Sequence, residues 1–403
     1  MFLESFLAIL VGLILGTCTG LTPGLHINTV SLIIVFSSPF LLNYFSPISI
    51  GIIIISLGIT HSFLDTIPSI FLGAPDPDTV LAILPGHRLF LEGMGYEAVK
   101  LTVIGSFFAL ILSLIAMPLI IPAIPFLYNI IKPYIGFLLI IVCSYMIYKE
   151  NTTIKKIKGI ILFLISGVLG YIVLNFPNLN QPLFPLLSGL FGISLLLVSL
   201  SNKIVLPKQL ITNKIWIGKS GLIKSISAAV LSGSLAGFLP GLGSAQAAIL
   251  ALSIVKSAGL YIFLVIVGGI NTVNFLFSIA TFYSIEKARN GAIVAITKII
   301  PSFSINETIL FLTVALIVGS FATFLTLKTT TIFSKLISKI NYRKCCLTII
   351  IFITIAVILT SKITGLLVLL TSTSIGLIGQ LSGVKKSLMM GCLIIPVIIY
   401  FLF

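Results

Sequence analysis

Charged residues are scarce in this chain. Aspartate and glutamate together number 9, and only 8% of the 403 residues carry a charge, where a soluble protein carries roughly 25%. So low a fraction excludes a soluble protein, and no polar stretch is long enough to fold alone. Hydrophobic residues make up 58% of the chain. They recur in runs of about 20, the length that crosses a bilayer as a helix. The sequence therefore predicts an all-α polytopic integral membrane protein.

Several functional signatures are missing as well. The 5 cysteines show no CxxC spacing and are expected to be small buried apolar residues. The chain has no Walker, GxSxG or HExxH sequence and no GxGxxG after a strand. We therefore expect no enzyme activity, no catalytic residue, no bound metal and no ATP-driven transport. Cofactors are not expected, apart from Na⁺ or H⁺ as a coupling ion.

The net charge of +15 does not indicate nucleic-acid binding, because the basic residues lie in short loops without interleaved aromatic residues. The N-terminus lacks a basic segment and an AxA cleavage site, so it is interpreted as a first span. Apolar spans are expected near 2–19, 25–45, 48–72, 99–124, 130–148, 159–176, 183–201, 222–238, 243–257, 259–284, 291–301, 308–327, 346–361, 364–380 and 387–403. The stretch 291–301 is too short to cross alone and is counted with 308–327 as one broken crossing.

A polar linker divides the chain into halves of nearly equal length. Residues 1–202 form an N-terminal membrane repeat, 203–221 a basic cytoplasmic linker and 222–403 a C-terminal membrane repeat. Lysine-rich loops mark the cytoplasmic side of a multi-pass protein in the cell membrane; they are 149–158, 203–224, 328–344 and 385–386. Charge-rich loops of one half fall opposite charge-poor loops of the other. This exchange predicts two inverted-topology repeats with Pro-Gly-broken or re-entrant helices.

Each half contains a Pro-Gly-Leu sequence between apolar runs, and the two lie 217 positions apart. Proline and glycine let a helix break, and the amides that follow a break can hold an anion. We expect substrate contacts at Pro23, Gly24, Leu25, His26, Asn28 and Thr29, and at Pro240, Gly241, Gly243, Ser244 and Gln246. The alternative interpretation is a proline kink between packed helices.

A second pair of motifs lies within spans. His61 and Asp65 are four residues apart and share a face of a helix. Ionisable residues at membrane depth indicate ion or substrate pathways. The counterpart contains Asn271 and Asn274, expected to face the same cavity. We assign His61, Asp65 and Asn271 to ion coupling, and Asn271 with Asn274 to substrate binding. The alternative is a structural pair that locks helices together.

The run 73–98 is the most polar part of the first half. Thr79 and Arg88 are candidate substrate residues, since arginine can bind a carboxylate through two hydrogen bonds. A solvated hairpin is the alternative. Its counterpart, 284–291, places Arg289 and Asn290 beside a glycine. Because all 3 histidines lie in the first half within motifs, an intramembrane hydrolase is a further alternative.

These motifs resemble the large membrane subunit (permease) of the tripartite tricarboxylate transporters. Pro240–Gly243 is similar to that family's Pro-Gly-Leu-Gly. The run 73–98 is similar to a series of short motifs in that family, which are matched here by Ala74-Pro75, Thr79, Pro85-Gly86, Gly93 and Ala98. The tail 382–396 is similar to the archaeal branch. The chain departs from the family at Leu25-His26, where Leu-Gly is usual, and at Pro85, where an aspartate is usual.

The resemblance implies ion-driven secondary transport of a small organic anion, in the first instance a carboxylate. With the inverted repeats, it implies alternating access around a site at the membrane midplane. It further implies an extracytoplasmic binding protein and a small membrane subunit as partners, beside the lipid bilayer and without nucleic acid. A flippase for a phosphate-bearing carrier lipid is the alternative function, because the same breaks would hold its headgroup.

Overall fold

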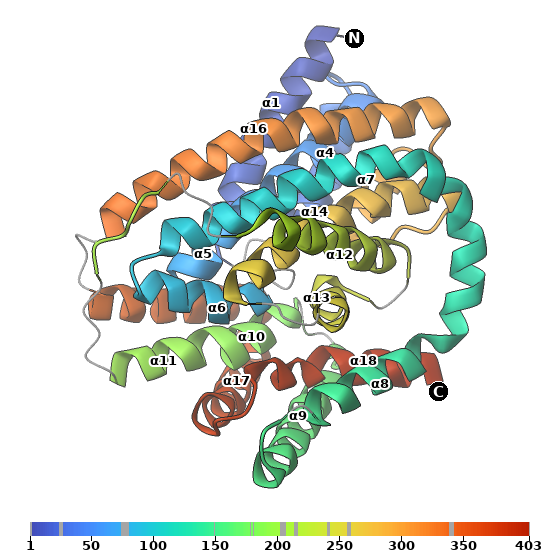
Figure 1. Cartoon of the computed structure of the whole chain (residues 1–403). Helices are drawn as coiled ribbons and strands as arrows, with labels where there is room; N and C mark the ends of the chain where they lie inside the picture. The colour runs from blue at the N-terminus through green and yellow to red at the C-terminus, as the bar shows by residue number, and fades with distance from the viewer. Residues whose placement is uncertain are drawn as a thin grey trace. The chain divides into compact units, whose positions relative to one another are not determined.

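All the regular secondary structure in the described part of the chain is helical, and no strand occurs there (Figure 1). The computed structural model describes residues 2–23, 27–73, 80–148, 150–177, 179, 181–201, 207–212, 217–239, 242–255, 259–337 and 342–402. These residues bear out the expected all-α fold.

The helices of the first half are α1 (Phe2–Leu21), α2 (Ile27–Phe36), α3 (Ser38–Leu41), α4 (Pro47–Leu64), α5 (Thr66–Phe71), α6 (Val80–Leu91), α7 (Gly95–Ile131), η1 (Lys132–Tyr134), α8 (Ile135–Tyr148), α9 (Thr153–Leu174), α10 (Leu183–Leu187), a π-helical turn η2 (Ser188–Ile193) and α11 (Ser194–Ser201). Those of the second half are α12 (Lys219–Phe238), α13 (Ser244–Ile254), α14 (Leu260–Ile285), α15 (Gly291–Thr297), α16 (Ile305–Ile337), α17 (Tyr342–Leu381), η3 (Lys386–Met390) and α18 (Gly391–Leu402).

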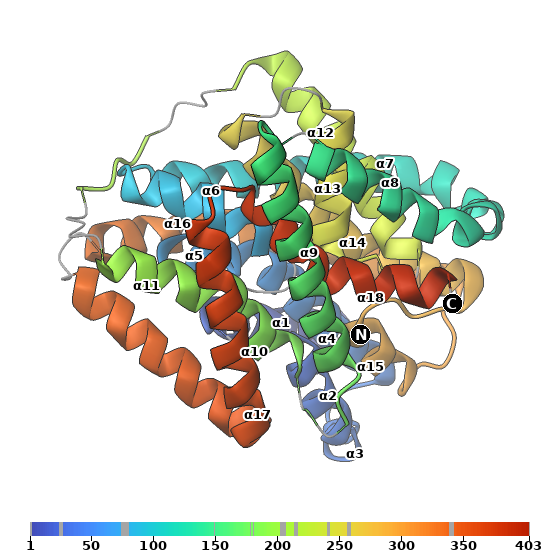
Figure 2. The same cartoon turned by 90° about the horizontal axis from the view of Figure 1, so that it is seen from below.

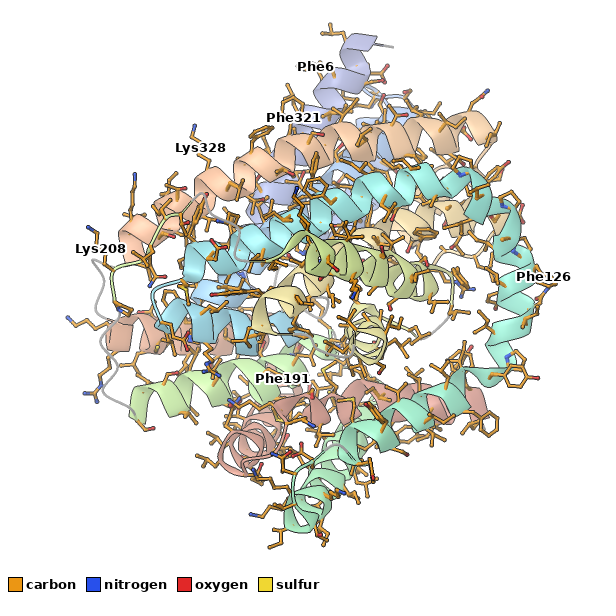
Figure 3. The ribbon with its side chains drawn as sticks, in the orientation of Figure 1. Phe6, Phe126, Phe191, Lys208, Phe321 and Lys328 are labelled. Carbon is orange, nitrogen blue, oxygen red and sulfur yellow. The ribbon has the colours of Figure 1, made fainter. Side chains whose placement is uncertain are left out.

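Within the described residues, 9 helical stretches are long and apolar enough to cross a membrane. Large apolar side chains also cover the outside of these helices. Phe6, Phe126 and Phe321 are at least half exposed, whereas Phe191 is fully buried (Figure 3). An outer surface of this kind suits lipid and not water, because water would penalise so much contiguous apolar area. The chain is therefore a multi-pass membrane protein.

The chain divides into two compact units. The first comprises residues 1–68, 96–129 and 211–332, and the second comprises 69–95, 130–210 and 333–403. Each unit takes segments from both halves of the sequence. The division predicted at 203–221 separates two sequence repeats, whereas these units are defined by compactness. The predicted division therefore stays a prediction.

In the first unit, glycines bring pairs of helices into close contact. α1 packs along α4, where a Cβ added at Gly16 would lie 2.5 Å from Thr60 Cβ and one at Gly20 would lie 2.8 Å from Leu64 Cβ. α12 packs along α14, and a Cβ added at Gly233 would lie 2.9 Å from Val273 Cβ. Small residues at such interfaces let helix backbones approach each other in a membrane. The first pair of helices belongs to one half of the sequence and the second pair to the other.

α7 and α14 approach each other still more closely. A Cβ at Gly105 would overlap the carbonyl oxygen of Val265, and one at Gly268 would overlap the carbonyl oxygen of Thr102. Between them, Ser106 Oγ donates a hydrogen bond to the carbonyl oxygen of Gly268 at 2.9 Å. These contacts fix the position of α14 within the unit.

In the second unit, α18 lies beside α9, and α17 packs against α10, η2 and α11 (Figure 2). The linker is anchored there by Gln209, which is buried. Its Oε1 accepts from the backbone N–H of Gly95 at 2.9 Å, and its Nε2 donates to the carbonyl oxygen of Phe90 at 3.0 Å. This anchoring holds the polar linker against the turn between α6 and α7.

The spans expected at 99–124 and 130–148 correspond to α7 and α8, which the short 3₁₀ turn η1 joins into one helical stretch from Gly95 to Tyr148. The prolines Pro118, Pro122 and Pro125 lie inside α7 without ending it; membrane helices tolerate proline where neighbouring groups satisfy the freed carbonyls. The stretch of 54 residues has room for two crossings at about 20 residues each.

Candidate functional site

The span over residues 47–71 is broken at Asp65, between α4 and α5. Pro68, three residues later, cannot donate to the carbonyl oxygen of Leu64, and its ring clashes with that group. The backbone N–H of Asp65 still bonds to the carbonyl oxygen of His61 at 2.9 Å. The Asp65 carboxylate therefore lies at a helix break inside a span, where it is 3% exposed.

Asn271 of α14 meets this carboxylate. Its Nδ2 donates to Asp65 Oδ2 at 2.9 Å and to the carbonyl oxygen of Ser62 at 3.2 Å. Asn271 is 5% exposed and lies near the middle of an unbroken helix of 26 residues. The structure thus brings together Asp65 and Asn271, which the sequence placed on opposite sides of one cavity.

His61 is buried and bonds in a different direction. Its Nδ1 lies 3.0 Å from Thr19 Oγ1, and that hydroxyl donates to the carbonyl oxygen of Gly16 at 3.1 Å. With the hydroxyl donating to Gly16, the Nδ1–H tautomer of His61 is the one that donates a hydrogen bond to Thr19. His61 thus ties the end of α1, just before the Pro23 turn, to α4.

Asn274, one helical turn beyond Asn271, contacts the start of α13. Its Nδ2 donates to Ser244 Oγ at 3.1 Å, and Ser244 is the first residue of α13. Gln246 Oε1 accepts from the backbone N–H of Gly243 at 3.0 Å, which satisfies one of the free amides before the helix. α14 therefore links the break at Asp65 to the helix start that follows the second Pro-Gly sequence.

Asn28 lies at the start of α2, where that helix meets α15. A Cβ added at Gly291 would lie 2.5 Å from Asn28 Cγ, so a larger residue there would displace the Asn28 side chain. Asn290 Oδ1 caps α15 by accepting from the backbone N–H of Ile293 at 2.8 Å. The first residues of one half's short helix thus pack against the first residues of a short helix from the other half.

Some predicted substrate residues lie outside the described residues. They are Gly24, Leu25, His26, Thr79, Pro240 and Gly241, together with the side chain of Thr29. Pro23 lies in the turn that follows α1. The role of the two Pro-Gly sequences as anion sites stays a prediction.

Arg88 and His87 belong to the second unit. Arg88 Nε pairs with Glu92 Oε1 at 3.0 Å on the same helix, and its side chain is 68% exposed. Its role as a carboxylate clamp stays a prediction. His87 Nδ1 donates to the carbonyl oxygen of Ile70 at 2.8 Å, and burial lowers the pKa of His87 to about 4. This imidazole is therefore neutral at pH 7 and connects α6 to α5.

Sequence reasoning missed several residues of this region. Thr19 contacts His61, and the carbonyl oxygen of Ser62 accepts from Asn271, although no sequence motif indicates either contact. Tyr128 lies against Lys287 and Arg289. The sequence shows Arg289 beside Gly291, but Tyr128 is 159 residues from Lys287 along the chain. Among the described residues, no group of three His, Cys, Asp or Glu side chains could hold a metal ion.

The comparisons with known proteins agree with this architecture. A family model described as tripartite tricarboxylate transporter TctA family matches residues 6–391. An uncharacterized protein of the archaeon Methanocaldococcus jannaschii is 32% identical over 408 residues, which cover 99% of each chain. No solved structure matches this chain. The resemblance of the sequence motifs is thereby confirmed: the chain belongs to the tripartite tricarboxylate transporter TctA family.

Proposed function

We propose that this protein is the membrane-embedded, ion-coupled carrier of an organic anion, in the first instance a carboxylate. Its family and its helical membrane fold point to a transporter component and not to an enzyme. The observation that carries the proposal is the buried hydrogen bond between Asp65 Oδ2 and Asn271 Nδ2, at 2.9 Å. A carboxylate at a helix break within a span is the kind of group that binds a coupling cation.

Asp65 would accept the coupling ion, either as a proton on its carboxylate or as Na⁺ beside it. The carbonyl oxygen of Ser62, which shares the amide of Asn271 with Asp65, is a second hard ligand of the type that Na⁺ prefers. Neutralising Asp65 weakens the bond from Asn271, because hydrogen bonds to charged acceptors are the stronger ones. Ion binding would thus change the contact between α4 and α14.

The substrate would bind where the Pro-Gly sequences interrupt helices. Asn274 lies one turn from Asn271 and donates to Ser244 at the start of α13, so amide and hydroxyl groups lie near the second sequence. Glycine-mediated packing of α1 on α4, and of α12 on α14, supports two related halves. Two halves of opposite orientation would allow alternating access around a site between them.

The family name describes a tripartite transporter. We therefore propose an extracytoplasmic binding protein and a small membrane subunit as partners in the cell membrane. The lysine-rich loops, 149–158, 203–224, 328–344 and 385–386, would face the cytoplasm. Substrate would then arrive from the opposite side.

A ligand-stabilisation screen tests the proposal without needing the partners. The purified chain is heated with di- and tricarboxylates or phosphorylated lipids, with and without Na⁺, at two pH values. A ligand at 100 times its Kd stabilises the folded state by about 2.7 kcal/mol. We expect a carboxylate to stabilise the protein more in the presence of the coupling ion.

The substitution Asp65→Asn locates the ion. We expect it to remove the dependence of carboxylate stabilisation on Na⁺ or pH. The matched control is Glu307→Gln, because the Glu307 carboxylate accepts from the backbone N–H of Ser304 at the exposed start of α16. Full ion dependence in Asp65→Asn would show that the coupling site is elsewhere. Stabilisation by phosphorylated lipids alone would favour a lipid carrier instead.

A further inference from the structure

Two cations converge on one tyrosine at the end of α14. Lys287 Nζ donates to Tyr128 Oη at 3.1 Å and lies 4.6 Å from the centre of its ring. The guanidinium carbon of Arg289 lies 5.2 Å from the same centre. Each contact is a favourable cation–π interaction, but together they place two positive charges side by side.

These charges have no carboxylate counter-ion among the described residues. Neither Lys287 nor Arg289 forms an ion pair with a carboxylate there. In the same part of the chain, Arg289 Nε and Nη2 are shielded from solvent and have no hydrogen-bond partner. Leaving charged donors buried and unpaired carries a desolvation penalty. A ligand that accepts from both nitrogens would recover that cost.

The two nitrogens form one edge of the planar guanidinium. That edge presents two parallel N–H groups at the spacing of the oxygens of a carboxylate or phosphate. Lysine cannot present such a fork, and it acts instead as a point charge. Arg289 therefore supplies the geometry and Lys287 the second charge.

The segment that carries both cations is held in place on either side. Before it, Ser284 Oγ donates to the carbonyl oxygen of Ile121 on α7 at 3.3 Å. After it, Asn290 caps α15, and Gly291 packs against Asn28. The backbone that follows Arg289 is thus held next to the start of α2, the helix that follows the first Pro-Gly sequence.

We propose that Arg289 and Lys287 form a binding site for an anionic carboxylate or phosphate group, with Tyr128 orienting the two cations. One oxygen pair of the ligand accepts from Arg289 Nε and Nη2, and Lys287 neutralises the remaining charge. The ligand is either a soluble polyanion or the headgroup of an anionic lipid. The site is separate from Asp65 and does not depend on ion coupling there.

The test measures binding to the full-length purified protein. Calorimetry with citrate and with inorganic phosphate reports soluble anions, and native mass spectrometry of nanodiscs that contain phosphatidylglycerol reports the lipid. We expect Arg289→Gln to weaken binding of at least one of these probes by tenfold or more. Arg289→Lys keeps the positive charge but not the two parallel N–H groups, so it should weaken binding by an intermediate amount. Lys287→Gln should weaken binding less than Arg289→Gln does.

The control is Arg343→Gln, which removes an exposed arginine in the first turn of α17 and should leave binding unchanged. Size-exclusion chromatography and circular dichroism verify that each variant is folded. Comparison with a double variant separates this site from the proposed function, since Arg289→Gln should cause the same fold-loss of binding with and without Asp65→Asn. Wild-type binding that Arg289→Gln leaves intact would overturn the proposal, as would the absence of binding of all three probes. A loss confined to the lipid, or to the soluble anions, identifies the source of the ligand.

Discussion

Replacing Gly268 by alanine tests how closely α14 must lie against α7. The new Cβ would overlap the carbonyl oxygen of Thr102, and Gly105 stands in the same relation to Val265. A backbone oxygen cannot move aside as the end of a side chain can. The two helices must therefore separate, which also stretches the 2.9 Å bond from Ser106 Oγ to the carbonyl oxygen of Gly268.

We expect Gly268→Ala to lower the free energy of unfolding by roughly 2 kcal/mol. Overpacking a tight interior costs about 1–3 kcal/mol, and the strained hydrogen bond adds about 0.6 kcal/mol in a membrane protein. The higher helix propensity of alanine offsets about 1 kcal/mol. The same separation moves Asn271, one turn along α14, away from Asp65. The ion-dependent stabilisation of the protein by a carboxylate ligand should therefore decrease along with the free energy of unfolding.

The assay is equilibrium unfolding in mixed micelles by titration with sodium dodecyl sulfate, followed by far-ultraviolet circular dichroism. The matched control is Gly221→Ala in α12. A Cβ there would meet Ile217 Cγ2 at 3.2 Å and Ile262 Cδ1 at 3.5 Å, both at the ends of side chains. This variant should be as stable as the parent or slightly more stable. If Gly268→Ala unfolds at the same detergent fraction as Gly221→Ala, the close contact with α7 does not constrain α14.

Two further predictions concern buried charge. His87 is held neutral, so its contribution is complete above pH 6.5 and is lost as pH falls through the folded-state pKa of about 4. At lower pH the loss is up to roughly 3 kcal/mol. In urea titrations, the difference in unfolding free energy between the parent and His87→Asn should shrink as pH falls from 6.5 to about 4. A difference that stays constant over this range would contradict the prediction. Lys100 Nζ pairs with the buried Glu97 at 2.5 Å and donates to the carbonyl oxygen of Thr212 at 2.7 Å. Lys100→Met should lower the free energy of unfolding by about 3–5 kcal/mol in thermal unfolding, because it leaves the Glu97 carboxylate unpaired. Adding Glu97→Gln to that variant should restore most of the lost stability. If stability is not restored, the unpaired carboxylate is not the cause.

The sequence predicts the helical membrane fold well, because apolar runs of crossing length are unambiguous in so uncharged a chain. The helix breaks are harder to predict. Pro68 breaks a helix at Asp65, but Pro118, Pro122 and Pro125 do not break α7. Whether proline ends a membrane helix depends on neighbours that satisfy the freed carbonyls, and a linear sequence does not reveal those neighbours.

The juxtaposition of Asp65 and Asn271 follows from comparing the two halves, because matched motifs are expected at matched depth. The bond from His61 to Thr19 was not predictable, since the four-residue spacing of His61 and Asp65 suggested instead that both face one partner. Tyr128 illustrates a further limit: it contributes to the basic site only through the fold. Its position in a long apolar run gave no hint of a charged neighbour.

The burial of Asp65 has an electrical consequence. Moving one elementary charge through the whole membrane potential corresponds to about 2.3 kcal/mol per 100 mV. A cation that enters from one aqueous phase to neutralise Asp65 travels through part of that potential drop. Accumulation by this route would draw on voltage as well as on the concentration gradient. A substrate that carries several negative charges would be opposed by an interior-negative voltage unless enough cations accompany it. In an ion-coupled carrier of this kind, the balance of positive and negative charge moved per cycle would set the direction of the current.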